Sequence, residues 1–178
     1  MIFQDPFASL NPRHKVGDII AAGPIAYGTQ KNDAIKRAQE LLQLVGLDPA
    51  VVDRYPHEFS GGQRQRIGIA RALALKPALI VADEPVSMID ASLRISVVNL
   101  LRRLRDEMGM SIIYITHDLA TAYYISDRII IMRKGQVVES GDARTVLDRP
   151  QHPYSIALKA AVLSPDGTNE KTEVTSHA

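Results

Sequence analysis

The stretch Leu79-Ile80-Val81-Ala82-Asp83-Glu84 decides the fold of this 178-residue chain. Four apolar residues in succession predict a buried strand, and buried strands of this kind are typical of a parallel sheet covered by helices. Two carboxylates follow directly, at the end of the strand where open α/β sheets bind their ligands. This stretch therefore predicts both an α/β fold and one edge of a polar site.

Strands and helices alternate along the chain after Pro77, and this order is typical of a parallel sheet with crossover helices. We predict strands at residues 78–82, 111–115, 128–132 and 136–139, and helices at about 91–108, 118–125, 142–147 and 153–163. The stretch Arg133-Lys134-Gly135-Gln136 predicts a hairpin turn between the last two strands.

The part of the chain before Pro77 is mostly helical in its pattern. We expect a short helix near residues 16–22, a helix over 32–46 with Asn32 as its N-cap, and a helix from Gly62 to about Leu75 capped by Ser60. The predicted organisation is thus a helical part over residues 1–76, an α/β part over 77–163, and a disordered polar tail over 164–178.

The composition is that of a globular domain: 46% of the residues are hydrophobic, 23% are charged, and the net charge is +1. This near-neutral balance gives no electrostatic support for nucleic-acid binding. The absence of cysteine excludes disulfides and Cys-based zinc sites. No apolar run approaches the roughly 20 residues that span a bilayer, so any membrane contact is expected to pass through a partner.

Three motifs carry candidate chemistry, and each also has a plain structural reading. Asp83 and Glu84 could hold Mg²⁺ and polarise an attacking water, or could form an ordinary acidic turn. The stretch 60–63, Ser-Gly-Gly-Gln, could present backbone N–H groups to an anion, or could simply cap a helix. His117 follows the strand at 111–115, where a histidine could reach a ligand or cap the next helix.

The order of these motifs resembles that of the ATPase subunit of an ABC transporter. Ser60-Gly61-Gly62-Gln63 is similar to the signature motif, Asp83-Glu84 to the Walker B carboxylates, Ser87-Met88-Ile89-Asp90 to the D-loop, His117 to the switch histidine, and Gln4 to the Q-loop glutamine. The resemblance covers about residues 1–163 and implies a P-loop NTPase fold of the ABC type, with a helical subdomain and a partial parallel sheet. It also implies that the cofactors are ATP and Mg²⁺.

The resemblance implies a role for each residue beside the nucleotide. Asp83 would hold Mg²⁺ through water, and Glu84 would act as general base on the attacking water. His117 would contact the γ-phosphate, whereas Gln4 would sense the γ-phosphate and Mg²⁺ and link the site to the membrane subunit.

Other residues would act across a dimer of ATPase subunits. Ser60, Gly61, Gly62 and Gln63 would close over the ATP held by the opposite protomer, and Asp90 would communicate across that interface. The resemblance leaves open whether helix residues Arg64, Arg66 and Arg71 orient the signature or lie in solvent or salt bridges.

Two segments narrow the resemblance to importers of the oligopeptide and dipeptide type. These are residues 3–13 around Gln4 and the stretch His152-Pro153-Tyr154 with its following helix. Importers of short oligosaccharides and of nickel belong to the same group, so the cargo stays open. The partners implied are a second ATPase subunit, identical or different, membrane permeases, and indirectly a solute-binding protein outside the cell. The chain would then lie peripherally on the cytoplasmic face of the membrane.

One expected motif does not occur in the sequence, namely the phosphate loop Gly-x-x-x-x-Gly-Lys-Ser/Thr. Gly23 and Gly28 have the right spacing, but Thr29 follows where the lysine is required. The resemblance implies that the loop would precede Met1, so we expect an N-terminally truncated subunit that is inactive alone. Two alternatives remain: a non-catalytic half-domain that donates its signature motif to a partner, and an ABC-type ATPase outside transport.

Overall fold

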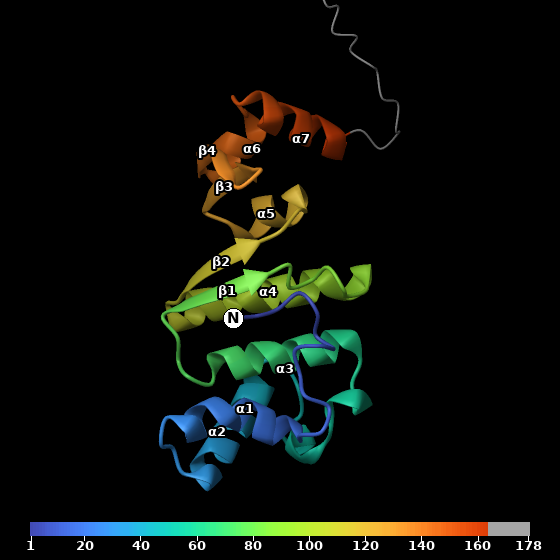
Figure 1. The fold of residues 1–178 in the computed structure, drawn as a ribbon, viewed down its shortest axis with the longest axis vertical. Coiled ribbons are helices and arrows are strands. Elements are labelled where there is room, and N and C mark those ends of the chain that lie inside the picture. Colours follow the sequence, from blue (N-terminus) through green and yellow to red (C-terminus); the bar gives the residue numbers. More distant parts are fainter. Residues whose placement is uncertain (164–178) are drawn as a thin grey trace, which may run out of the picture. The chain divides into compact units, whose positions relative to one another are not determined.

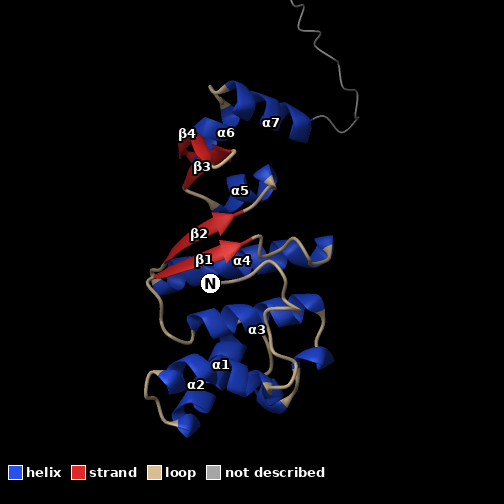
Figure 2. Cartoon of the chain, in the orientation of Figure 1, coloured by secondary structure: helices blue, strands red, loops and turns tan. Residues whose placement is uncertain are grey.

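The computed structural model describes residues 1–163, and the predicted disordered tail over 164–178 lies outside the described residues. Figure 1 shows the elements in chain order, and Figure 2 separates helices from strands. They are α1 (Val16–Ala26), α2 (Lys31–Leu44), the 3₁₀ turns η1 (Pro49–Asp53) and η2 (Pro56–Glu58), α3 (Gly61–Leu73), β1 (Leu79–Asp83), α4 (Ala91–Met108), β2 (Ser111–Ile115), α5 (Leu119–Ile125), β3 (Arg128–Arg133), β4 (Gln136–Asp142), α6 (Ala143–Asp148) and α7 (Pro153–Leu163).

The contacts within the chain group it into two compact units, and each is described by itself. The first unit runs from Met1 to His117, and the second begins at Asp118. Every residue that the sequence singled out as a nucleotide-site candidate lies in the first unit. The predicted functional division between residues 76 and 77 stays a prediction.

A parallel pair of strands, β1 and β2, forms the sheet of the first unit, as the alternating pattern predicts. Leu79 lies opposite Ser111 and Asp83 lies opposite Ile115, so the two strands end at the same edge. Ile2 extends this sheet on the other side of β1: its N–H donates to the Val81 carbonyl at 2.8 Å, and its carbonyl accepts from the Asp83 N–H at 3.0 Å. The start of the chain is therefore fixed to the strand that carries the carboxylates.

Helix α3 is the centre of the helical part of this unit, where it contacts α1, α2 and α4. Its apolar side chains Ile67, Ile69 and Leu73 are fully buried, as are Leu41 and Leu42 of α2. Full burial of a side chain of this size stabilises the fold by about 1.5–3 kcal/mol. The packing of α3 therefore holds the region that follows Ser60 in a defined place.

Some predicted helix boundaries were wrong. Helix α2 begins at Lys31 with Gln30 at the N-cap position, because the Gln30 carbonyl already accepts the first helical bond from the Ala34 N–H; Asn32 lies inside the helix. Helix α1 continues past residue 22 to Ala26, although it contains Pro24. The burial of Pro24 and Ala21 in the core explains how packing carries the helix past the proline.

In the second unit, β3 and β4 form an antiparallel hairpin, with a register shift between Ile131 and Met132. Lys134 and Gly135 both have positive φ, at 48° and 78°, as the tight hairpin turn requires and as the sequence predicts. Asp142 caps α6, which packs on β4 together with α7. Within residues 1–163, no helix is both long and apolar enough to span a membrane.

Candidate functional site

The site is built on Glu84, the residue after β1. Its backbone has a positive φ of 41°, which is unusual for a residue with a side chain. Three hydrogen bonds hold this conformation: the Glu84 N–H donates to the Ile115 carbonyl at 2.9 Å, and the Glu84 carbonyl accepts from the Ser87 N–H at 3.1 Å and the Ser87 hydroxyl at 3.0 Å. Backbone strain of this kind is concentrated at functional sites.

The Glu84 carboxylate binds two other predicted site residues directly. One oxygen, Oε1, lies 3.0 Å from His117 Nδ1, and the other, Oε2, accepts from Gln4 Nε2 at 3.1 Å. A carboxylate accepts hydrogen bonds, so His117 Nδ1 is the donor in this contact. The other ring nitrogen, Nε2, takes no part in the bond to Glu84. The His117 side chain is 76% exposed and that of Glu84 is 25% exposed. The cluster thus combines a partly buried carboxylate, that of Glu84, with an exposed imidazole ring, that of His117.

Asp83 precedes this cluster at the end of β1 and is half-buried. Its backbone is held by Ile2, and it lies opposite Ile115 in the sheet. Among the described residues, no group of three or more His, Cys, Asp or Glu side chains is placed to hold a metal ion by itself. A single carboxylate nevertheless fits Mg²⁺, which usually keeps its waters and binds one or two carboxylates together with substrate phosphates.

The predicted signature forms the N-terminus of α3. Ser60 and Gln63 make a reciprocal capping box: Ser60 Oγ accepts from the Gln63 N–H at 3.4 Å, and Gln63 Oε1 accepts from the Ser60 N–H at 3.0 Å. Ser60 is exposed, whereas Gly62 is buried against α4, where an added Cβ would lie 3.1 Å from a Leu93 methyl. The capping box and the close packing of Gly62 show that this stretch caps the helix. The start of the 13-residue helix is also exposed, so its backbone N–H groups could bind an anion.

The predicted D-loop lies beside this helix start. A Cβ built on Gly61 would lie 3.9 Å from the Met88 carbonyl oxygen and 3.8 Å from the Phe7 ring. Asp90 is exposed at the N-cap position of α4, and its side chain makes no capping hydrogen bond. The structure therefore places the signature and the D-loop together, and it joins Gln4, Glu84 and His117 in a second group.

The three arginines of α3 contact backbone carbonyls. Arg64 Nε donates to Phe59 O at 2.9 Å, Arg66 Nη1 to Val45 O at 2.6 Å, and Arg71 Nη1 to Ser9 O at 2.5 Å. Burial lowers the pKa of the Arg71 guanidinium from its ordinary value, because a low-dielectric surrounding disfavours the charged form.

Sequence reasoning missed Gln65, which is only 2% exposed and whose Nε2 donates to Phe3 O at 3.5 Å. A signal for it exists in the sequence. Gln65 has the same helical phase as the buried residues Ile69 and Leu73, so it is a polar side chain in an apolar stripe.

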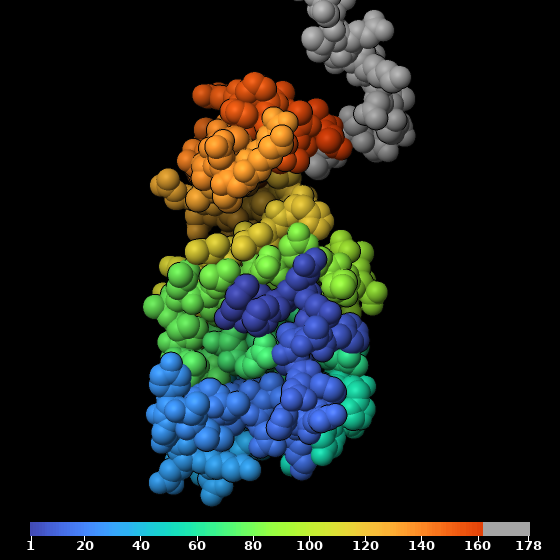
Figure 3. Space-filling view, viewed as in Figure 1, coloured from blue at the N-terminus to red at the C-terminus, as the bar shows by residue number. Residues whose placement is uncertain are grey.

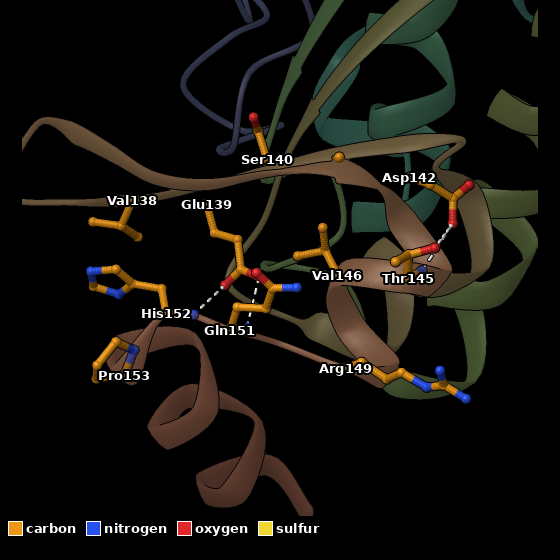
Figure 4. Close-up of a pocket in the computed structure, with 11 residues that line it drawn as sticks. Val138, Glu139, Ser140, Asp142, Thr145, Val146, Arg149, Gln151, His152 and Pro153 are labelled. Atoms are coloured by element: carbon orange, nitrogen blue, oxygen red, sulfur yellow. Dashed lines mark hydrogen bonds between the residues drawn. The ribbon is translucent and has the colours of Figure 1, made fainter.

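The second unit contains a cavity of about 530 Å³ between β4, α6 and the segment before α7 (Figure 4). Its carboxylates are engaged by the chain itself. Glu139 accepts from the N–H groups of Gln151 and His152 at 2.9 and 3.1 Å, and Asp142 accepts from the Thr145 N–H at 2.9 Å. These contacts give the two carboxylates of the cavity a structural role.

Comparison with known proteins shows a similarity to ABC transporter ATPases. Residues 1–87 match the family model described as ABC transporter. The chain is 52% identical over 98% of its length to the oligopeptide transport ATP-binding protein OppF of Streptococcus mutans, of which it covers 57%, and 51% identical over 97% of its length to OppF of Escherichia coli K12, of which it covers 52%. The chain thus spans about half the length of the curated relatives it matches.

Solved structures show the same similarity. The dimeric ATP-binding cassette MJ0796, in a post-hydrolysis state bound to ADP and Pi, matches 80% of this chain and 62% of its own, with a TM-score of 0.68 and 31% identity. CbiO1 of Clostridium perfringens, part of the transporter complex cbiONQ, matches 92% of this chain and 63% of its own, with a TM-score of 0.74 and 26% identity. The chain is similar to ABC transporter ATPases, and among them to the oligopeptide-transport ATP-binding proteins.

Proposed function

We propose that this chain supplies the water-activating group and the signature motif of the ATP-binding subunit of an oligopeptide importer. The observation that carries the proposal is the Glu84 carboxylate, held between Gln4 and His117 at the end of β1. A carboxylate in that place can take a proton from water as it attacks a phosphoryl group. The family relationship and the OppF relatives support this reading of the cluster.

Each residue of the cluster has a distinct task in the proposed reaction. Glu84 accepts the proton of the attacking water through one of its carboxylate oxygens. His117, whose ring carries a proton on Nδ1 toward Glu84, presents its exposed Nε2 to the phosphate side. Gln4 holds the second Glu84 oxygen, so that the carboxylate keeps its direction. Asp83 would hold Mg²⁺ through water, which would supply charge stabilisation of the transferring phosphoryl group.

The signature residues Ser60, Gly61, Gly62 and Gln63, together with Asp90, are proposed to meet ATP on a second ATPase subunit. Their exposed position at the start of α3 and beside the D-loop supports such a contact. The other proposed partners are the membrane permeases and a solute-binding protein, with the chain peripheral on the cytoplasmic face of the membrane. Because the phosphate-loop motif does not occur in the sequence, we propose that ATP binding by the isolated chain is weak.

A second function uses only the exposed signature residues at the start of α3. The chain could donate Ser60 and its glycines to the ATP of a partner without any hydrolysis at Glu84. In that case the Glu84 carboxylate would have no task in transport. The two functions therefore differ in what removal of this one carboxylate does.

Peptide uptake by cells that carry the transporter with this chain tests the proposal. Glu84→Gln keeps the size of the side chain but removes the base, so uptake of a labelled oligopeptide should fall by about 10²–10⁴-fold. Glu107→Gln on the exposed side of α4 is the matched control and should leave uptake unchanged. Normal uptake with Glu84→Gln would favour the donating half-domain, and equal loss in both variants would reject a specific role of Glu84.

A further inference from the structure

The segment before α1 is attached to the rest of the first unit at two different places. At residue 2 it is hydrogen-bonded to β1, through the Ile2 contacts with Val81 and Asp83. From residue 3 to residue 9 it lies against α3. Figure 3 shows the dark-blue atoms of this segment on the surface beside the green atoms of the middle of the chain. Gln4 lies where the attachment changes from one element to the other.

Side chains of α3 make the second attachment. Gln65 Nε2 donates to Phe3 O at 3.5 Å on one side of Gln4, and Arg71 Nη1 donates to Ser9 O on the other. The Arg71 guanidinium also lies over the Phe3 ring at 5.9 Å, and that of Arg64 lies over the Phe7 ring at 4.2 Å. Cation–π contacts of this length strengthen the attachment of the segment to α3. These contacts therefore fix the position of the segment relative to α3.

The segment is also stiff in itself, so that a displacement at one end reaches the other. Asp5 Oδ1 accepts from the N–H groups of Phe7 and Ala8 at 2.7 and 3.1 Å, and the Ser9 N–H donates to the Asp5 carbonyl at 3.1 Å. Turns closed by an aspartate side chain leave the backbone few alternatives. The position of Ser9 is thus tied to that of Gln4.

We propose that Gln65 and Arg71 are positioning residues, which set the Gln4 side chain on Glu84 according to the place of α3. The Gln4 amide reaches Glu84 Oε2 at 3.1 Å, and a shift of about 1 Å would break a bond of that length. Since α3 begins with the signature residues, a ligand that pulls on Ser60 would change the direction of the Glu84 carboxylate through this connection. This inference rests on the proposed function for its purpose, but the connection itself exists without nucleotide.

Burial makes Gln65 suited to this task. Gln65 is buried, so its replacement by a side chain without an N–H group would leave the Phe3 carbonyl without this donor. The segment would then move to find another donor. Arg66, one residue further along α3, provides the contrast, because it donates to Val45 O and Ser96 Oγ and contacts no residue of the segment in the described interactions.

The test is the side-chain amide signal of Gln4 in the NMR spectrum of the full chain, without nucleotide, assigned by its loss in Gln4→Met. Glu84→Ala gives the position of this signal when the contact is broken. We expect Gln65→Met and Arg71→Met to move the signal to that position. The control Arg66→Met, and Arg71→Lys, which retains a charged donor, should leave it where it is in the wild-type chain.

The outcomes separate clearly. An unmoved signal in Gln65→Met or in Arg71→Met would overturn the proposal, and so would an equal shift in Arg66→Met, which would indicate a general loosening of α3. If Arg71→Met does not fold, Gln65→Met against Arg66→Met decides alone. Because ATP is absent from the sample, failure of the connection is distinguishable from failure of the proposed hydrolysis.

Discussion

At the scale of the residue, Glu84 determines what the molecule can do, and its backbone is strained by its position. A positive φ costs a residue with a Cβ about 1–2 kcal/mol relative to glycine. The contacts from Ile115 and Ser87 offset this cost. With this backbone conformation, the Glu84 carboxylate lies between Gln4 and His117. The strain lowers the stability of the fold at the place of the proposed chemistry.

This strain predicts an unusual order of stability among variants. Glu84→Gly should unfold at a higher urea concentration than Glu84→Ala, by about 1 kcal/mol in the free energy of unfolding, because glycine adopts a positive φ without strain. Both variants lack the carboxylate, so they differ only in the Cβ. The opposite order, with alanine more stable as in ordinary helices and strands, would show that Glu84 is relaxed in solution.

Single residues also show how far the sequence predicts the site. Glu84, His117 and Gln4 were predicted as site residues from motif order, and the structure brings them together. Gln65 and Ser87 were not predicted to support them. The Gln65 amide reaches the carbonyl of residue 3, 62 positions away, and this pairing depends on tertiary packing that local sequence does not encode. Ser87 bonds the carbonyl of residue 84, three positions back, which is one of several local bonds that a serine can make.

Among the helices and strands, the sequence predicted the central residues of each element better than its first and last residues. The helix at 91–108 and the strand at 111–115 have the predicted bounds, because Asp90 precedes the first and Gly109, with φ of 62°, ends it. Strand β4 instead continues to Asp142, beyond the predicted residue 139. The extra pairs, such as Ile129 with Gly141, depend on a partner strand and a register shift that no local pattern reveals.

The second unit should lose stability in acid because of two carboxylates beside β4. Thr145 donates to Asp142; the Ser155 hydroxyl lies near Glu139, and the N–H groups of Gln151 and His152 donate to it. These neighbours hold the pKa of each carboxyl below its usual value. A carboxyl of this kind stabilises the fold fully above its unfolded pKa of about 4, and the contribution is lost as the pH falls through the lower folded pKa.

Urea unfolding at a series of acidic pH values, followed by the NMR signal of Val146 in α6, measures this effect. The double variant Asp142→Asn, Glu139→Gln should show a weaker decline of stability with falling pH than the wild-type chain. Glu107→Gln on α4 is the control for loss of a charge elsewhere. An unchanged decline in the double variant would mean that these contacts do not hold in solution.

In the molecule as a whole, the chain has motifs that resemble those of an ABC ATPase, and it spans about half the length of the curated relatives it matches. The exposed apolar side chains Leu79, Ile113 and Ile115 of the β1–β2 sheet agree with a surface that meets further protein. The sequence predicted the fold class because buried strands and helix caps are local signals. The cargo and the partner subunits depend on surface residues, about which these local signals carry no information.

ATP binding and phosphate release by the purified transporter that contains this chain with Glu84→Gln decide whether Glu84 is the base. If Glu84 is the base, the variant binds ATP as tightly as the wild type, and phosphate release falls by about 10²–10⁴-fold. Release at the wild-type rate, with ATP still bound, would contradict the assignment of Glu84 and with it the account given for Gln4 and His117.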